Sequence, residues 1–312
     1  MAKKIAPNLE KVLKEVVTVI NFIKSRALNS RLFAQLCQEM GSEYETLLLH
    51  AEVRWLSRGR TLKRVIQLKD EIKIFLIQTN QSMAEYFGND IWLLKVCYMA
   101  DIFERLNELN LSLQGENFNV INLVCKIKGF IIKIGLWKLS IEKNKIEIFP
   151  WTNEFIVENH LNVSEIKIII LNHLSELESQ FAKYFSADIN AENYNWIQQP
   201  FLCDIASLQH LNTKAQHEFA ELSTDSTLKL AFTTQTLGNF WMSVKNEFPL
   251  LTDLAVEILL SFATTYLCEC AFSTLLYIKS KYRTQLALRP ALSKIEPRLT
   301  LLCKNKQAHP SH

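Results

Sequence analysis

Apolar residues recur at helical spacing through most of this chain, and this periodicity is the strongest constraint on its fold. The segments 9–23, 62–75, 92–106, 121–131 and 166–181 place Leu, Ile, Val or aromatic residues three and four positions apart. That spacing puts apolar side chains on one helix face, where they can be buried together. Only seven Gly and seven Pro interrupt the 312 residues. We therefore expect a mainly α protein.

Local signals indicate where several of these helices begin and end. Pro7 stands at the start of the first apolar repeat, and Pro is tolerated in the first turn of a helix. Asn29-Ser30 is expected to cap a second helix and Thr61 a third, because their side-chain oxygens can accept from free backbone N–H groups. Gly41 is expected to end the second helix.

Two short segments alternate polar and apolar residues, which is typical of a half-buried β-strand. They read KIEIF at 145–149 and STLKLAF at 226–232. The segment 186–220 is polar, is broken by Pro200, and is expected to be a connector with short helical turns. One or two strands are therefore expected among the helices.

Basic residues are concentrated in two stretches, although the net charge of +3 is too small to indicate a nucleic-acid partner by itself. Residues 54–64 hold five basic residues and no acid, and residues 279–306 hold eight and one acid. Either stretch could contact DNA phosphates. A solvated helix start, or cations favoured at a helix end, explains them as well. The candidate DNA-binding side chains include Arg54, Arg58, Arg60, Lys63, Arg64, Lys279, Lys281 and Arg283.

The seven cysteines show no metal-binding spacing. No C-x-x-C pair occurs, and Cys268 and Cys270 form only C-x-C. No second His or Cys stands three or four residues from His173, which is expected in the core or at its boundary. Reduced thiols, no metal and no cofactor are therefore expected. Glu10 and Lys11 argue against a secretory leader, and no uncharged apolar run is long enough to cross a bilayer, so no membrane partner is expected.

One carboxylate stands within the apolar segment ATTYLCECAFSTLL at 263–276. A buried, unpaired Glu269 would cost several kcal/mol or become neutral. Glu269 is therefore expected to point to water, to be paired, or to be the remnant of a site.

Three long segments carry a family resemblance. They are HAEVRWLSRGRTLKRVIQLKDEI (50–72), FWMSVKNEFPLLTDLAVEILLSFATTYLCECAFSTLLYIKSKYRTQL (240–286) and IEPRLTLLCKNKQAHPSH (295–312). The chain resembles the hAT-superfamily DNA transposases, and more closely the transposase-derived zinc-finger BED domain-containing and FAM200-type proteins. The resemblance implies a helical insertion domain over 1–220. It also implies, over 221–312, a C-terminal remnant of an RNase H-like α/β domain with few strands and the family's dimerisation region.

The resemblance also implies roles for single residues. In the family, three acids hold two divalent cations for strand cleavage, and Glu269 matches the third acid. Arg54 and Trp55 match the RW motif, whose Trp holds an unstacked base in active relatives. Packing at a domain junction is the other reading of Trp55.

The family's first two Asp residues find no match in this chain, which resembles relatives only from just after their C-x-x-H motif. The BED zinc finger is likewise expected to be missing. Asp70, Asp90, Asp101 and Asp225 lie in segments that indicate surface helix or loop. One carboxylate cannot hold two cations about 4 Å apart, so we expect a catalytically inactive protein with Glu269 as a vestige.

Two functions of different class follow from these expectations. The first is a nuclear association module, a homodimer or a hetero-complex with related transposase-derived proteins. The second is a DNA-binding remnant. A metal-dependent transposase or nuclease would need acids supplied elsewhere, and a decayed transposon fragment without a role is a further alternative. The dimerisation candidates are the large apolar side chains Phe240, Trp241, Phe248, Leu251, Leu254, Ile258, Phe262 and Phe272.

Overall fold

The computed structural model describes residues 6–48, 56–114, 119–185, 194–204 and 208–261, and these residues form helices and connecting turns. No β-strand occurs among them. The expectation of a mainly α protein is confirmed.

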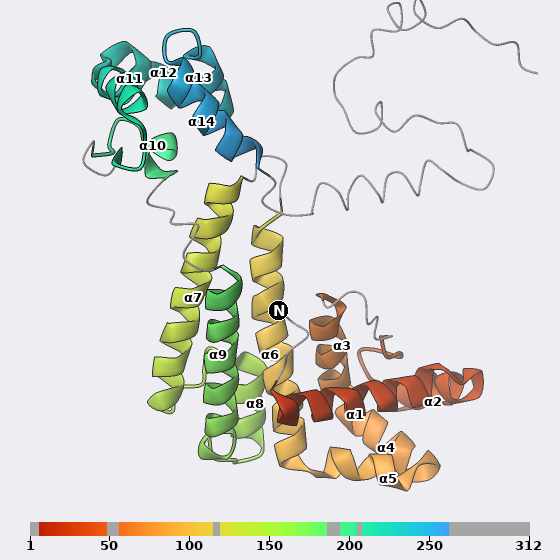
Figure 1. Ribbon diagram of the computed structural model, residues 1–312. Coiled ribbons are helices and arrows are strands. Elements are labelled where there is room, and N and C mark those ends of the chain that lie inside the picture. Colours follow the sequence, from red (N-terminus) through yellow and green to blue (C-terminus); the bar gives the residue numbers. More distant parts are fainter. Residues whose placement is uncertain (1–5, 49–55, 115–118, 186–193, 205–207, 262–312) are drawn as a thin grey trace, which may run out of the picture.

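The helices fall into three groups along the chain (Figure 1). The first group is α1 (Pro7–Lys24), α2 (Ala27–Glu39), α3 (Leu56–Gln67), α4 (Lys69–Thr79), α5 (Gln81–Ala84) and the 3-10 turn η1 (Glu85–Gly88). The second group is α6 (Asp90–Ser112), α7 (Val120–Glu142), α8 (Pro150–Glu158) and α9 (Ser164–Tyr184). The third group is α10 (Asn195–Gln198), α11 (Thr213–Thr224), α12 (Ser226–Thr234), α13 (Leu237–Ser243) and α14 (Pro249–Leu260).

Helix α6 is the centre of the larger core. Twelve of its residues are buried, among them an almost continuous run from Trp92 to Phe103. A helix buried on all sides needs neighbours around its whole circumference. Helices α1, α3, α7, α8 and α9 supply them, and α7 and α9 also pack along each other (Figure 1).

A second, smaller core holds the third group of helices together. Trp196, Phe219, Phe240 and Trp241 are fully buried there, and the two indole rings meet edge to face at 5.4 Å. Ile121 near the start of α7 belongs to this core as well, so α7 reaches both cores (Figure 1). The second core includes residues on both sides of position 220. The domain division expected there stays a prediction.

Both predicted strands are wrong. Residues 226–234 form α12, whose N-terminus is capped by the Asp225 carboxylate, which accepts from Thr227 N and Leu228 N at 2.7 and 2.9 Å. Leu228 and Phe232, four positions apart, then face the second core together. The segment 145–149 is a turn, in which Phe149 N donates to Ile146 O and the side chains of both residues are buried. Alternation over so few residues also fits i, i+3 and i, i+4 contacts.

Two predicted caps are also misplaced. Helix α2 begins at Ala27, so Asn29 lies inside it, where its amide donates to Phe22 O. Thr61 is buried within α3 rather than at its start. Gly41 follows α2 with φ of +69°, which confirms the predicted end of that helix. No helix in the described residues combines the length and apolar character needed to cross a membrane.

Candidate functional site

The basic residues of α3 lie against aromatic rings from other segments. The Arg58 guanidinium carbon lies 6.0 Å from the centre of the Phe103 ring in α6. Lys63 Nζ lies 5.0 Å from the Trp151 ring centre, and the Arg64 guanidinium carbon 3.5 Å from the Tyr44 ring centre. Each of these pairs is within the distance at which a cation is attracted to an aromatic face.

Helix α3 packs against α6 at Gly59, where an added β-carbon would make ordinary van der Waals contact rather than a clash. A β-carbon placed on Gly59 would lie 3.4 Å from the β-carbon of Phe103. Arg64 Nη1 also donates to Thr46 O at 3.0 Å. Four of the predicted basic residues therefore lie on α3, but three of them, Arg58, Lys63 and Arg64, contact aromatic rings of the chain itself. Arg60 is exposed, and no ion pair or ring contact of Arg60 is seen among the described residues.

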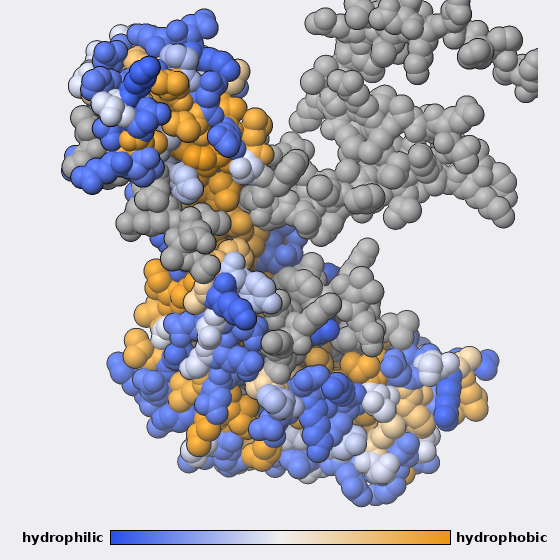
Figure 2. Space-filling model, viewed as in Figure 1, coloured by the Kyte–Doolittle hydropathy of each residue, from blue (hydrophilic) through white to orange (hydrophobic). Residues whose placement is uncertain are grey.

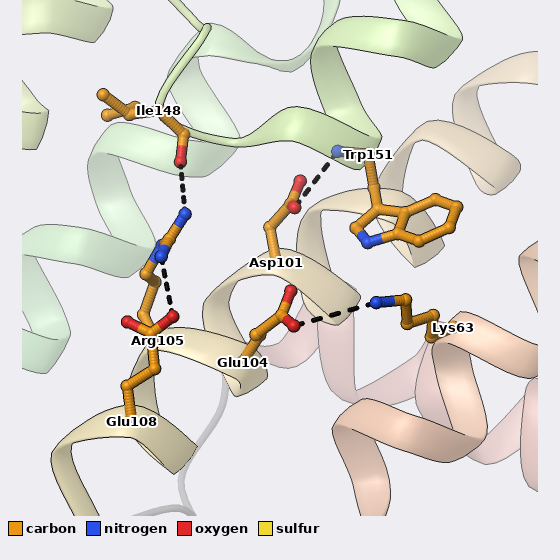
Figure 3. Close-up of polar contacts among 7 residues, drawn as sticks. All are labelled: Lys63, Asp101, Glu104, Arg105, Glu108, Ile148 and Trp151. Carbon is orange, nitrogen blue, oxygen red and sulfur yellow. Dashed lines mark hydrogen bonds and ion pairs between the residues drawn. The ribbon is translucent and has the colours of Figure 1, made fainter. Parts of the chain in front are cut away.

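Asp101 corrects an expectation, because it is buried rather than on the surface. Its carboxylate accepts from Trp151 N at 3.1 Å (Figure 3). It also accepts from Thr152 N at 2.9 Å and from the Thr152 hydroxyl at 2.7 Å. Burial raises the pKa of Asp101 to about 6, although the bonds from Thr152 and Trp151 oppose that shift. Asp101 therefore acts as an N-terminal cap of α8 from 49 residues earlier in the chain, counted to Pro150.

Other polar residues of the same part of α6 bind α3 and the turn before α8 (Figure 3). Glu104 pairs with Lys63 of α3 at 3.8 Å. Arg105 donates to Glu108 at 2.8 Å and to Ile148 O at 3.4 Å. These contacts tie α6 to α3, to α8 and to the turn before α8, so this polar face of α6 is a structural junction.

His173 is buried in α9, as expected for a core or boundary residue. Its Nδ1 lies 2.9 Å from the Tyr98 hydroxyl of α6. Burial lowers the pKa of His173 to about 4 and raises that of Tyr98 well above its ordinary value. A neutral imidazole and a neutral phenol therefore share a hydrogen bond between the two helices.

The C-terminal helices bury much of their apolar surface in the second core. Phe240, Trp241, Phe248 and Leu251 are buried there, so these four dimerisation candidates already have partners within the chain. Trp241 Nε1 donates to Ile197 O at 3.1 Å, and the Thr252 hydroxyl donates to Trp241 O at 3.2 Å. The indole N–H and the backbone carbonyl of Trp241 are thus both paired.

A different apolar set of the same helices faces solvent. Leu230 of α12 is 68% exposed and Leu260 of α14 is 73% exposed. Met242 is exposed as well, while Leu254 and Ile258 are half-buried. Figure 2 shows apolar surface over α13 and α14. A strand over 226–232 would place Leu228, Leu230 and Phe232 on one face. In the helix α12, Leu230 lies opposite the face of Leu228 and Phe232.

Two segments of the chain match known protein families. Residues 2–142 match the FAM200/GTF2IRD2 helical domain, and residues 216–292 match the hAT family C-terminal dimerisation region. The two matches occur in the order that the resemblance predicts. The protein is derived from an hAT transposase. No solved structure matches the chain.

In this hAT-derived protein, the basic helix α3 belongs to the matched helical domain and α11–α14 to the matched dimerisation region. Several predicted site residues lie outside the described residues: Arg54, Trp55, Phe262, Glu269, Phe272, Lys279, Lys281 and Arg283. Within the described ranges, no three His, Cys, Asp or Glu side chains converge as a metal site would require. The roles predicted for Glu269 and Trp55 stay predictions.

Proposed function

We propose that this hAT-derived protein acts by self-association, or by association with related transposase-derived chains, without strand cleavage. The observation that carries the proposal is the match of residues 216–292 to the hAT dimerisation region. The described part of that region folds into helices that pack in the second core, so it can present a fixed surface.

The exposed leucines of these helices support association. Leu230 and Leu260 expose most of their side-chain surface, and the partly exposed Leu254 and Ile258 add to it. Exposed large apolar side chains of this kind are candidates for a protein interface. The interface is therefore expected on these side chains rather than on the buried Phe240 and Trp241.

The proposed lack of catalysis is supported by how the acids are used. Asp101, a buried acid, caps α8 through three hydrogen bonds. Divalent-metal-dependent nicking of DNA is expected neither from the chain nor from Glu269→Gln. Nicking that disappears in Glu269→Gln would contradict this part of the proposal.

The mass of the full chain in solution tests association directly. We expect light scattering at micromolar concentration to give a dimer or a larger complex. Leu230→Glu combined with Leu260→Glu is expected to shift the mass toward the monomer, because a charge would have to be buried at the interface. Mixing with a related chain would reveal hetero-association by the same measurement.

Leu202→Glu is the matched control. Leu202 is 78% exposed but lies before the matched dimerisation region. This variant should keep the wild-type mass. A monodisperse wild-type monomer, or equal loss of association in both variants, would contradict the proposed surface.

A second candidate function is weak, sequence-independent DNA contact in the nucleus. The observation that favours it is the exposed Arg60 on a helix whose neighbouring residues Arg58, Lys63 and Arg64 are all cationic. Affinity should fall steeply with salt, because phosphate binding releases counterions. Arg60→Ala should reduce the salt slope by about one, whereas Arg31→Ala on the exposed face of α2 should not. Salt-independent binding, or none, would remove this candidate.

A further inference from the structure

A groove of about 580 Å³ lies between α6 and α7, outside both surfaces discussed above. Leu109, Phe130, Trp137 and Ile148 supply an apolar lining. The Phe130 and Trp137 rings meet edge to face at 5.5 Å and fix that wall. An apolar groove between two helices can receive an amphipathic third helix.

Gly129 leaves the middle of the groove open. It lies on the α7 wall, and a β-carbon built there meets no atom within 4 Å. Beyond this wall the apolar surface continues over Ile132 and Leu136, which are 64% and 56% exposed. Figure 2 shows apolar atoms at the outer edge of α7. Together the groove and this edge form an amphipathic surface, whose polar part includes the cationic side chains of Lys126 and Lys133.

The cations at the groove come from α7. Lys126 and Lys133 both line it, and no ion pair of either is seen among the described residues. Arg105 and Glu108 of α6 also line the groove, but their charges pair with each other at 2.8 Å, and Arg105 also donates to Ile148 O. Helix α7 carries four lysines and one glutamate, Glu142. The groove therefore favours an anionic occupant.

This charge distribution selects among occupants. A second copy of α7 would place lysines against lysines, which costs free energy across an interface. The chain's own residues 279–306 hold eight basic residues and one acid, so they carry the wrong sign as well. Nucleic acid would match the lysines, but it leaves Leu109, Phe130 and Trp137 without an apolar partner.

We propose that the α6–α7 groove docks an acidic amphipathic helix of a partner protein. Apolar side chains of that helix enter the groove beside Gly129, and its flanking carboxylates meet Lys126 and Lys133. This docking is independent of the C-terminal dimerisation region, so the protein would join two kinds of chain at two places.

The probe is a designed helical peptide of about 16 residues, roughly 24 Å long, with Leu on one stripe and Glu on both flanks. A chloroacetyl group at its end reacts with a nearby thiol. Cys125 is exposed at the groove, whereas Cys37 and Cys97 are buried. We expect a covalent adduct at Cys125 of the full chain, located by mass spectrometry, and none there with a scrambled peptide of equal composition.

Two variants test the contacts by fluorescence anisotropy with the unreactive peptide. Lys126→Glu with Lys133→Glu should weaken binding roughly tenfold or more, since two attractions become repulsions. Lys128→Glu with Lys183→Glu changes the net charge equally outside the groove and should have a much smaller effect. Gly129→Phe should fill the groove and also weaken binding. Gly135→Phe, where a β-carbon likewise meets nothing within 4 Å, is its control.

Several outcomes would overturn the proposal. They include an adduct that forms equally with the scrambled peptide, and binding that Gly129→Phe leaves unchanged. A peptide in which Lys replaces every Glu would contradict the charge argument if it bound as tightly as the acidic peptide. If instead a DNA duplex binds, loses affinity in the charge-reversal variant and the acidic peptide does not bind, the groove is a nucleic-acid site. Dimer mass is measured separately, so failure here leaves the proposed association intact.

Discussion

Asp101 and His173 are buried titratable groups that respond to pH in opposite directions. Burial raises the pKa of Asp101 to about 6, so the native state keeps a proton there that the unfolded chain loses near pH 4. Burial lowers the pKa of His173 to about 4, so the unfolded chain gains a proton there first as the pH falls. Between about pH 4 and pH 6, a rise in pH therefore lowers the Asp101 contribution to the free energy of unfolding and raises the His173 contribution.

Asp101→Ala should lower the free energy of unfolding by roughly 3 kcal/mol, because it removes a helix cap and leaves buried donors unpaired. The donors are Trp151 N, Thr152 N and the Thr152 hydroxyl. Glu104→Ala on the same helix removes only a partly exposed ion pair and should cost less than about 1 kcal/mol. Urea unfolding of both variants measures the difference, and equal costs would contradict the capping role.

His173→Gln should make stability less sensitive to acid. In the wild type, the His173 contribution is fully present above about pH 6.5 and is lost as the pH falls toward 4. Between pH 7 and pH 5 this loss amounts to roughly 2 kcal/mol. The variant retains an acceptor for the Tyr98 hydroxyl without that titration. Urea unfolding at both pH values should show the gap between wild type and variant narrowing in acid, and a constant gap would be the contrary result.

At the level of helices, α8 and α14 begin in the same way. Each starts with Pro after a buried Phe, at Phe149-Pro150 and at Phe248-Pro249, and neither has a capping side chain of its own. A carboxylate from another helix replaces the cap. Asp101 binds the second and third residues of α8, and Glu218 of α11 binds Leu250 N at 3.4 Å and Leu251 N at 3.0 Å of α14.

Glu218→Ala should therefore destabilise the second core by about 1 kcal/mol, since it removes an anion from the start of α14. Glu221→Ala is the control, because Glu221 lies on the same helix but is exposed. Thermal unfolding monitored at the C-terminal helices distinguishes the two variants. An equal effect of both would show that the carboxylate adds nothing beyond helix propensity.

At the scale of the whole molecule, the two hydrophobic cores contain different residues and are linked through α7, whose Ile121 belongs to the smaller one. Their stabilities are therefore expected to be partly independent. Phe219→Ala should cost roughly 3 to 5 kcal/mol in the second core and accelerate hydrogen exchange in α11–α14. Exchange in α4 and α6 should stay near wild type. Uniform acceleration across both cores would indicate one cooperative unit.

Periodicity and family-specific segments were sufficient to predict helices from Leu9 to Phe181, the buried position of His173 and the hAT origin. They work because a helical repeat of apolar residues has few other ways to be buried. The errors in predicted secondary structure fell on short segments. Residues 226–232 satisfy both a strand pattern and a helix pattern, and the Asp225 cap together with burial of Leu228 and Phe232 favours the helix.

Only the tertiary structure decided which side chains, polar or apolar, are available to a partner. Arg58, Lys63 and Arg64 are cations on one helix, yet each lies against an aromatic ring from another segment of the chain. Asp101 belongs to a helix pattern but caps another helix 49 residues later. Phe240 and Trp241 are buried, while Leu230 and Leu260 face solvent. The physical reason is that local spacing fixes the face of a helix on which a side chain lies, whereas exposure and hydrogen-bond partners depend on which other helices cover that face.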